Sequence, residues 1–165
     1  MVSRCVKCGH RRRLRLKRAE YRYEIGGLAG ITLHDIVVST CPSCGDCEIT
    51  LPAIDGLHRA IARAIIAKRQ RLTPTEIRFL RKQLGLSGLD LAIHLGTTPE
   101  SVSRWENGRT AMGVTADRLL RLMVAVSQHG ATYSLNALRV VARREPRVMP
   151  IHVRWNDGEW EAVTL

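Results

Sequence analysis

Four of the five cysteines in the chain form two matched pairs, Cys5-x-x-Cys8 and Cys41-x-x-Cys44, and a glycine follows each pair directly. This spacing places two thiolates on one side of a turn, and two such turns together supply the four sulfur ligands of a tetrahedral zinc ion. The segment between the pairs is long enough for two strands and a loop. We therefore predict one structural Zn²⁺ site with Cys5, Cys8, Cys41 and Cys44 as its ligands.

Two other uses of these cysteines fit the sequence less well. A redox dithiol requires a thioredoxin-like βαβ surround, and a catalytic zinc requires an open coordination position and a nearby base. The sequence arranges neither, although His10 and His34 are at hand. The segment CPSCGDC also contains an alternative C-x-x-C pair, Cys44 with Cys47. We prefer Cys41 with Cys44, because they follow a predicted strand and mirror the first pair, and we interpret Cys47 as a buried or free thiol.

Residues 1–52 are predicted to form a small β domain that positions these cysteines. Apolar and polar residues alternate over 18–25, which is the period of a half-buried strand. The stretch GGLAG, residues 26–30, is interpreted as a flexible connection. Residues 31–40 are predicted as a second strand, and a change of phase within 33–36 indicates a bulge.

Residues 53–73 are predicted as a linker helix with a short connector, and residues 74–126 as an all-α domain of short helices. Thr73 and Pro74 open the first of these helices as its N-cap and first helical residue. Glycines end the helices that follow, and Thr115 is expected to cap the last and longest one.

The C-terminal segment, residues 127–165, is expected to hold a helix over 134–144 and then a β-hairpin. An Asp-Gly dipeptide between two short alternating runs suits a two-residue type I′ turn. The register that this turn sets pairs Trp155 with Trp160 and Arg154 with Glu161, and both pairs are favourable across strands.

Within the all-α domain, two short helices joined by a tight glycine turn over 88–107 form the pattern of a helix-turn-helix unit, whose second helix lies in the major groove of DNA. Val102 and Trp105 share the face that must pack inward, so Glu100 and Arg104 point outward. A guanidinium can donate two hydrogen bonds to a guanine edge, and a helix N-terminus can bind phosphate. The candidate DNA contacts are Ser87, Thr98, Pro99, Glu100, Ser101, Ser103, Arg104, Asn107 and Arg109. The predicted fold class is therefore α+β: a small zinc-stabilised antiparallel β domain, a linker helix, an all-α helix-turn-helix domain and a C-terminal β-hairpin.

The formal net charge of +11 favours a polyanionic partner such as nucleic acid. Residues 1–22 carry nine basic side chains and one acidic one, whereas residues 23–58 carry five acids and no Lys or Arg. No apolar run approaches the ~18 residues of a membrane span, and the first residues lack the apolar centre of a secretory signal. We therefore expect no membrane association and a cytoplasmic location, where thiols stay reduced.

The string LRKQLGLSGLDLAIHLGTTPESVSRWENGR resembles the lambda-repressor-like (Xre-type) helix-turn-helix family over residues 74–126. Together with the cysteine pairs and the stretch ITLHDIVVSTCPSCG, it makes residues 1–126 resemble the MqsA-type (YgiT-type) zinc-finger antitoxin family. The resemblance implies that the zinc domain is structural and binds a toxin, a small mRNA-cleaving ribonuclease. It also implies a C-terminal domain that dimerises and binds a palindrome in the promoter of its own operon. The family's base-reading positions fall on Glu100 and Arg104, and Gly88 stands where Xre-type relatives commonly have Gln.

These observations predict a homodimeric, sequence-specific DNA-binding transcriptional regulator, the antitoxin of a type II toxin–antitoxin pair, which represses its own operon. Its expected partners are double-stranded operator DNA and a small ribonuclease toxin. The alternative is a stand-alone zinc-finger and helix-turn-helix regulator with no toxin, which the basic N-terminal segment and the C-terminal hairpin support. A zinc-ribbon RNA-binding protein is a third hypothesis, although only Tyr21 and Tyr23 are there to stack on bases. An enzyme is not expected, because no nucleophile–base set, phosphate-binding glycine loop or carboxylate pair stands out.

Overall fold

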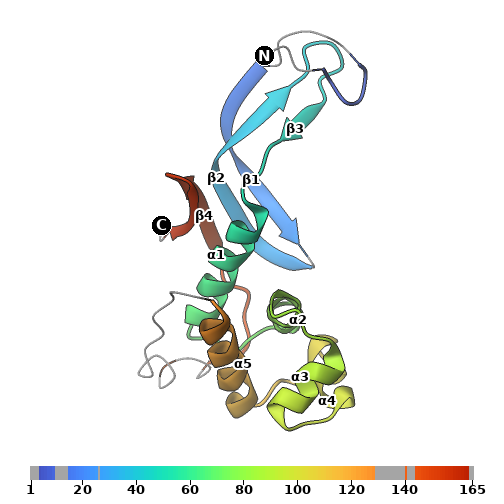
Figure 1. The fold of residues 1–165 in the computed structure, drawn as a ribbon, viewed down its shortest axis with the longest axis vertical. Helices are drawn as coiled ribbons and strands as arrows, with labels where there is room; N and C mark the ends of the chain where they lie inside the picture. The colour runs from blue at the N-terminus through green and yellow to red at the C-terminus, as the bar shows by residue number, and fades with distance from the viewer. Residues whose placement is uncertain (1–3, 10–14, 26, 129–139, 141–143, 164–165) are drawn as a thin grey trace.

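The computed structural model describes residues 4–9, 15–25, 27–128, 140 and 144–163. It confirms the predicted α+β class. A twisted β-sheet carries a cysteine cluster at one end of an elongated molecule, and a group of short helices forms the other end (Figure 1). In the described part of the chain, no helix is long and apolar enough to cross a membrane.

The sheet is built on one long strand, β2 (Leu28–Thr40), which pairs in antiparallel with β1 (Arg15–Ile25). Two short elements share the other edge of β2. The strand β3 (Cys47–Ile49) pairs in antiparallel with its last residues, and β4 (Ile151–Asn156) pairs in parallel with its first half. The strand β5 (Glu159–Val163) completes the sheet beside β4.

The bulge expected in the second strand is present. Ala19 pairs with Ile36, but Tyr21 pairs with Leu33, so β2 has one more residue than β1 between these two pairs. Asp35 lies within the bulge and has a φ of 59°. This left-handed conformation is uncommon for a residue with a side chain, and aspartate tolerates it better than most.

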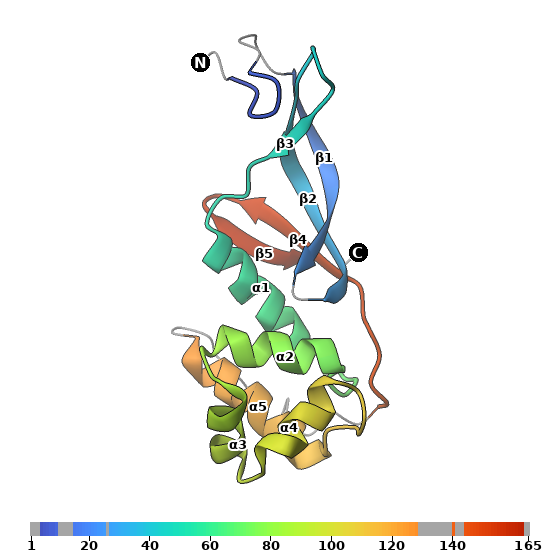
Figure 2. The same ribbon diagram turned by 90° about the vertical axis from the view of Figure 1, so that its right-hand side faces the viewer.

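The predicted C-terminal hairpin is confirmed in its register, with Trp155 opposite Trp160 and Arg154 opposite Glu161. Its place in the molecule is a finding of the structure, because β4 adds to the sheet formed by the first 49 residues (Figure 2). Arg154 Nε lies 3.0 Å from the carboxylate of Asp35 at the bulge. The C-terminal hairpin is thus part of the N-terminal sheet, although more than a hundred residues separate them in the chain.

The helix α1 (Ile54–Ala67) packs against β4 and β5 and connects the sheet to the helical end (Figure 2). Its buried side chains, with Ile31 and Leu33 of β2 and Val153 of β4, belong to one hydrophobic core that continues into the helices. The indole of Trp160 closes this core and donates a hydrogen bond to the Pro52 carbonyl at 2.8 Å. The remaining helices are α2 (Pro74–Gln83), α3 (Gly88–Leu95), α4 (Pro99–Glu106) and α5 (Val114–Ser127).

Two local predictions were wrong. Residues 28–30 belong to β2 rather than to a flexible connection, because the cross-strand pairing of Ile25 with Leu28 extends the hairpin to a tight turn. Thr115 does not cap α5, since the helix already begins at Val114 after Gly113 and has no side-chain cap. The helix expected over 134–144 falls almost wholly outside the described residues.

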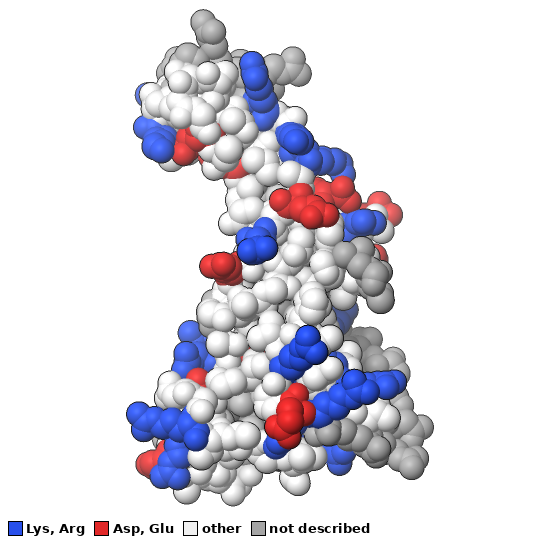
Figure 3. Space-filling model, turned by 180° about the vertical axis from the view of Figure 1, so that it is seen from behind, with Lys and Arg blue, Asp and Glu red and all other residues white. Residues whose placement is uncertain are grey.

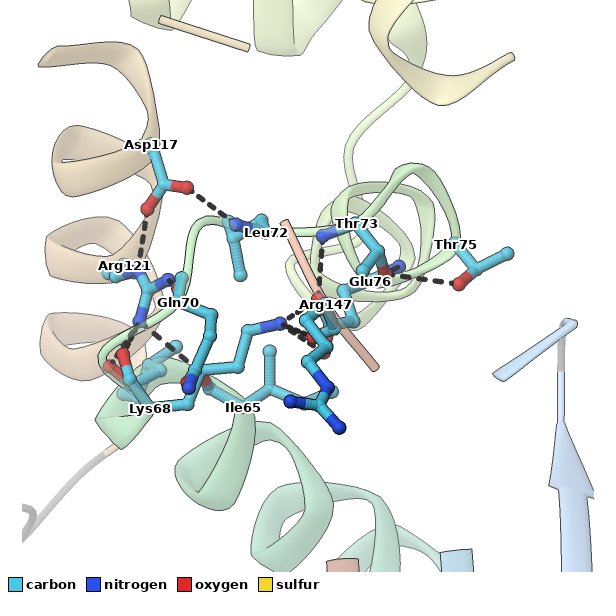
Figure 4. A network of polar contacts seen from close by, with 11 residues as sticks. Ile65, Lys68, Gln70, Leu72, Thr73, Thr75, Glu76, Asp117, Arg121 and Arg147 are labelled. Carbon is cyan, nitrogen blue, oxygen red and sulfur yellow. Dashed lines mark hydrogen bonds and ion pairs between the residues drawn. The ribbon is translucent and has the colours of Figure 1, made fainter. Parts of the chain in front are cut away.

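A buried arginine of α5 holds the end of α1. Arg121 is fully buried, and its guanidinium donates to the backbone carbonyls of Ile66 (2.9 Å), Lys68 (2.8 Å) and Gln70 (2.6 Å) (Figure 4). The last carbonyl groups of a helix have no partners within the helix, so Arg121 takes the role of a C-cap for α1. Asp117, one turn earlier in α5, accepts from Arg121 Nε at 2.6 Å.

The same network reaches α2 and the segment before β4. Glu76 accepts from Lys68 Nζ at 2.7 Å and from the Thr73 backbone N–H at 2.6 Å, which closes a capping box at the start of α2. Lys68 also donates to the Arg147 carbonyl at 3.0 Å. Burial lowers the pKa of Lys68, and the Glu76 carboxylate acts in the opposite direction. Figure 4 shows this network, in which Lys68, Glu76, Asp117 and Arg121 link the end of α1 to α2 and α5.

Candidate metal centre and nucleic-acid interface

The four cysteines predicted as zinc ligands come together at the far tip of the sheet. Their sulfur atoms all lie within 4.8 Å of one another. The Cys5 and Cys44 sulfurs are 3.8 Å apart, and those of Cys8 and Cys41 are 3.7 Å apart. A tetrahedron with Zn–S bonds of about 2.3 Å has S–S edges of about 3.8 Å. The four thiols therefore have the donor atoms and the spacing of a closed zinc site, as the sequence predicts.

Both cysteine turns are built in the same way. The Gly9 N–H donates to the Cys5 carbonyl at 2.9 Å, and the Gly45 N–H donates to the Cys41 carbonyl at 3.0 Å. The glycines have φ of 71° and 73°, a conformation that a side chain would strain. Backbone N–H groups, that of Cys44 first, lower the pKa of the Cys41 thiol to about 7. These donors stabilise the thiolate, which is the form that binds zinc.

The pKa of Cys44 is shifted in the other direction. Its strongest single contact, the backbone N–H of Asp46, acts to lower this pKa, but the hydrogen bond with the Cys8 thiol, burial, and the hydrogen bonds with the thiols of Cys41 and Cys5 raise it to about 12. Thiols at this spacing share protons, because several thiolates side by side repel one another. A divalent cation removes that repulsion, so the cluster favours a bound metal.

Cys47 lies outside the cluster. It is an exposed free thiol in β3, which is one of the two states that the sequence left open. A contact that sequence reasoning missed ties the first cysteine turn to the second, where Lys7 Nζ lies 3.3 Å from the carboxylate of Asp46. Both side chains sit two residues after a ligand, Cys5 or Cys44, which is the only signal of the pairing in the sequence.

The helices α3 and α4 are joined by a tight turn at Gly96, which has the left-handed φ of 62°. Ser87 and Asp90 form a reciprocal capping box at the start of α3, with hydrogen bonds of 2.9 and 3.1 Å. The Thr98 hydroxyl accepts from the Ser101 backbone N–H at 3.2 Å and caps α4. Two short capped helices joined by a tight glycine turn are consistent with the helix-turn-helix unit that the sequence predicts.

One face of α4 is buried and the other is exposed, as predicted. Val102 is buried and Trp105 is half-buried against the core, whereas Glu100 and Arg104 are exposed. The backbone N–H of Glu100 itself and the Thr98 hydroxyl lower the pKa of the Glu100 carboxyl. Glu100 is therefore ionised at neutral pH, beside Arg104 on the exposed face.

Some of the candidate DNA contacts already have partners within the protein. Asn107 Nδ2 donates to the Ser103 carbonyl at 2.8 Å, and its Oδ1 accepts from Arg78 at 3.0 Å. Ser101 is half-buried beside the Thr98 hydroxyl. The candidates that are exposed are Ser87, Thr98, Pro99, Glu100, Ser103, Arg104, Asn107 and Arg109.

Sequence reasoning missed the carboxylate that holds α4 in place. Glu106 is buried at the end of α4 and accepts from Arg81 Nε at 2.6 Å and Nη2 at 2.9 Å. Arg78 donates to the Glu106 carbonyl at 2.9 Å. Arg78 and Arg81 are three apart on α2 and share one face, but nothing local to α4 shows that Glu106 turns toward them.

Basic side chains are spread over this protein rather than gathered in one patch on the face that Figure 3 shows. Lysines and arginines lie at the sheet tip and over the helical end, with acidic side chains between them. In the described part of the helical end, ion pairs are formed by Arg78, Arg81 and Arg121. Lys82 and Arg104 are exposed and form no ion pair with a described residue. Exposed cations of this kind are available to phosphate.

One family of known proteins matches most of the chain. The family model described as the antitoxin component of a bacterial toxin–antitoxin system, MqsA, matches residues 3–131. The matched segment holds the four clustered cysteines and α1 to α5, and it ends before β4. A comparison with curated proteins found no match.

Proposed function

Because this chain belongs to the MqsA family of antitoxin components of bacterial toxin–antitoxin systems, we propose that it is a DNA-binding transcriptional regulator that represses its own operon and neutralises a toxin. The observation that carries the DNA-binding part is the exposed face of α4. Arg104 lies there without a described ion-pair partner, on a short helix whose opposite face is held by Val102 and Glu106. A fixed helix with a free guanidinium suits direct readout of a guanine edge in the major groove.

A homodimer suits this proposal, because a repressor of this kind binds two half-sites related by symmetry. The helical end carries an apolar groove of about 440 Å³ between α3 and α5. Val126, at the rim of this groove, is 74% exposed. The apolar residues that line the groove are Leu84, Leu86, Leu119, Leu122, Met123 and Val126.

The substitution Arg104→Ala tests the role of α4. We expect it to weaken binding to the operon's own promoter by about 1–3 kcal/mol and to relax the preference at one base position. The measurement is a fluorescence-anisotropy titration of a labelled promoter fragment, repeated at several salt concentrations. Affinity should fall steeply with salt for the unchanged protein, because phosphate contacts release counterions.

The matched control is Arg69→Ala, since Arg69 is also exposed but lies in the connector between α1 and α2. Its removal should leave the base preference unchanged. Equal promoter affinity for the Arg104→Ala protein and the unchanged protein would contradict the proposal that α4 contacts the DNA.

The toxin-binding part rests on the family and on exposed apolar side chains at the sheet tip. Leu16 on β1 is 69% exposed and Val6 in the first cysteine turn is 86% exposed. Apolar side chains so fully exposed are common at protein interfaces when they gather on one surface. We propose that this tip contacts a small ribonuclease toxin.

An affinity purification from the native host at moderate salt, followed by mass spectrometry, tests this contact. We expect a small protein encoded beside this chain to co-purify in stoichiometric amount, and the double substitution Val6→Glu and Leu16→Glu to abolish its recovery. Val148→Glu is the control, because Val148 is also exposed but precedes β4. Promoter binding by the same variants shows whether the helical end is intact.

A stand-alone regulator remains the second candidate function. The net charge of +8 over residues 1–22 favours it, because basic segments of this kind follow the DNA backbone or a minor groove. Recovery of nucleic acid alone in the purification, removed by nuclease, would favour this function over the antitoxin.

A further inference from the structure

A cavity lies where the C-terminal hairpin meets α1 and the end of α5. Its volume is about 500 Å³, within the range of about 300–1,000 Å³ that is usual for small-molecule sites. It is far from the cysteine cluster along the sheet, and α3 and α4 do not contribute to it. Its lining residues come from three places: α1 from its N-cap to Arg63, the end of α5, and the C-terminal hairpin.

Two arginines of α1 line one side of this cavity. Arg59 and Arg63 are four residues apart, so they lie on the same face of the helix. Neither forms an ion pair with a described residue, and Glu159 on the opposite wall is not within ion-pair distance of either. Like charges at this spacing destabilise a helix slightly. A bound anion would remove this repulsion.

One of these arginines is held in position by the helical end. Arg63 Nε donates to Gln128 Oε1 at 2.8 Å, which leaves the two terminal nitrogens of the guanidinium without an acceptor in the described part of the chain. Gln128 is buried at the end of α5, and its Nε2 has no hydrogen-bond partner among the described residues. Arg63 is therefore the contact that orients the Gln128 amide.

The other wall of the cavity is aromatic. Trp155 and Trp160 both line it, with ring centroids 5.4 Å apart in an edge-to-face arrangement. Trp160 is fixed by its hydrogen bond to the Pro52 carbonyl. Gly56 of α1 keeps the space beside Trp160 open, since a side chain there would begin 3.6 Å from the indole ring. Indole rings bind flat apolar groups well.

We propose that this cavity binds a small organic anion, a carboxylate or phosphate group on a flat ring. The guanidinium groups of Arg59 and Arg63 bind the anionic group, because an arginine fork matches both carboxylate and phosphate oxygens. The indoles of Trp155 and Trp160 bind the ring. The ligand thus contacts the hairpin, α1 and, through Arg63 and Gln128, the last turn of the helical end.

Isothermal titration calorimetry on the full chain tests this site. The probes are benzoate, adenosine 5′-monophosphate and inorganic phosphate, which separate a ring carboxylate, a ring phosphate and the anion alone. We expect saturable binding of one of the two ring-bearing probes and roughly ten-fold or greater weakening by Arg63→Ala or Arg59→Ala, because each removes hydrogen bonds to a charged group. Trp155→Leu should weaken binding of the ring-bearing probe by a similar factor.

Arg69→Ala is the matched control, because this exposed arginine lies outside the cavity, and it should bind the probe as the unchanged protein does. The site is disproved if neither ring-bearing probe binds saturably, or if Arg59→Ala, Arg63→Ala and Trp155→Leu all leave the affinity unchanged. Equal affinity for inorganic phosphate and for the ring-bearing probe would disprove the aromatic half of the site. The titration contains no DNA and no toxin, so its outcome is independent of the proposed function.

Discussion

Removal of zinc should unfold the tip of the sheet and leave the rest of the molecule folded. The tip consists of residues 4–9, 15–17 and 38–49, and its buried apolar side chains are essentially those of the cysteines themselves. A closed zinc site contributes roughly 10–16 kcal/mol to folding in small domains, so nothing at the tip can replace it. The lower half of the sheet is different, because β2 there shares a hydrophobic core with α1 and pairs with β4.

The expected loss of structure is confined to this tip and does not extend over the whole β domain of residues 1–52 that the sequence predicts. The measurement is hydrogen–deuterium exchange with mass spectrometry, before and after a zinc chelator. Peptides from the tip should lose protection, and those from the first half of β2 and from α1 to α5 should keep it. Cys44→Ser should reproduce the loss without chelator, whereas Cys47→Ser should bind zinc normally, because Cys47 lies outside the cluster. Loss of protection over all of β1 and β2 would mean that the hairpin and α1 do not support the sheet.

Asp117→Ala should be among the most destabilising single substitutions in the helical end. Asp117 is fully buried, and its carboxylate accepts from Arg121 Nε at 2.6 Å and from the Leu72 backbone N–H at 2.7 Å. The substitution leaves the Arg121 cation buried without its counter-charge and the Leu72 N–H without an acceptor. Removing one partner of a buried ion pair typically costs about 3–5 kcal/mol. Urea denaturation followed by circular dichroism measures this free energy of unfolding.

Two further variants distinguish the loss of the buried ion pair from the general effect of removing an acidic side chain from the first turn of a helix. Glu100→Ala also removes an acid from the first turn of a helix, but this side chain is exposed, so its loss should change the free energy of unfolding far less than Asp117→Ala does. The double substitution Asp117→Ala with Arg121→Met should recover part of the loss, because it removes the unpaired charge as well. The recovery should be incomplete, since the carbonyls of Ile66, Lys68 and Gln70 then lose their donor. A cost below about 1 kcal/mol for Asp117→Ala would show that water replaces the lost contacts.

The parts of the fold that the sequence predicts well depend on neighbouring residues. The cysteine pairs, with their following glycines, predict the metal centre. The caps at Thr73, Ser87 and Thr98 and the glycine at 96 predict α2, α3 and α4 to within a residue or two. The Asp-Gly turn predicts the register of the C-terminal hairpin. In each case a few adjacent side chains satisfy backbone groups or set a turn, so the signal is local.

The start of α5 shows the limit of such signals. Thr115 is a good capping residue by type, but α5 already begins at Val114 after Gly113, without a side-chain cap. In its first turn, Asp117 instead contacts Leu72 and Arg121, which no local signal predicts. Arg121 itself is on an amphipathic helix of a basic protein, where an arginine is ordinarily exposed.

The sequence alone predicts an α+β chain with a four-cysteine zinc site and a helix-turn-helix unit, because ligand spacing, capping residues and hydrophobic period act over a few residues. The tertiary structure decides how these parts are joined. It pairs β4 in parallel with β2, buries Arg121 as the cap of α1, holds Glu106 between two arginines, and closes a cavity between α1 and the hairpin. These contacts join residues that are far apart in the chain. Their energy comes from desolvated charges and shared apolar surface, which leave no periodic pattern in the sequence.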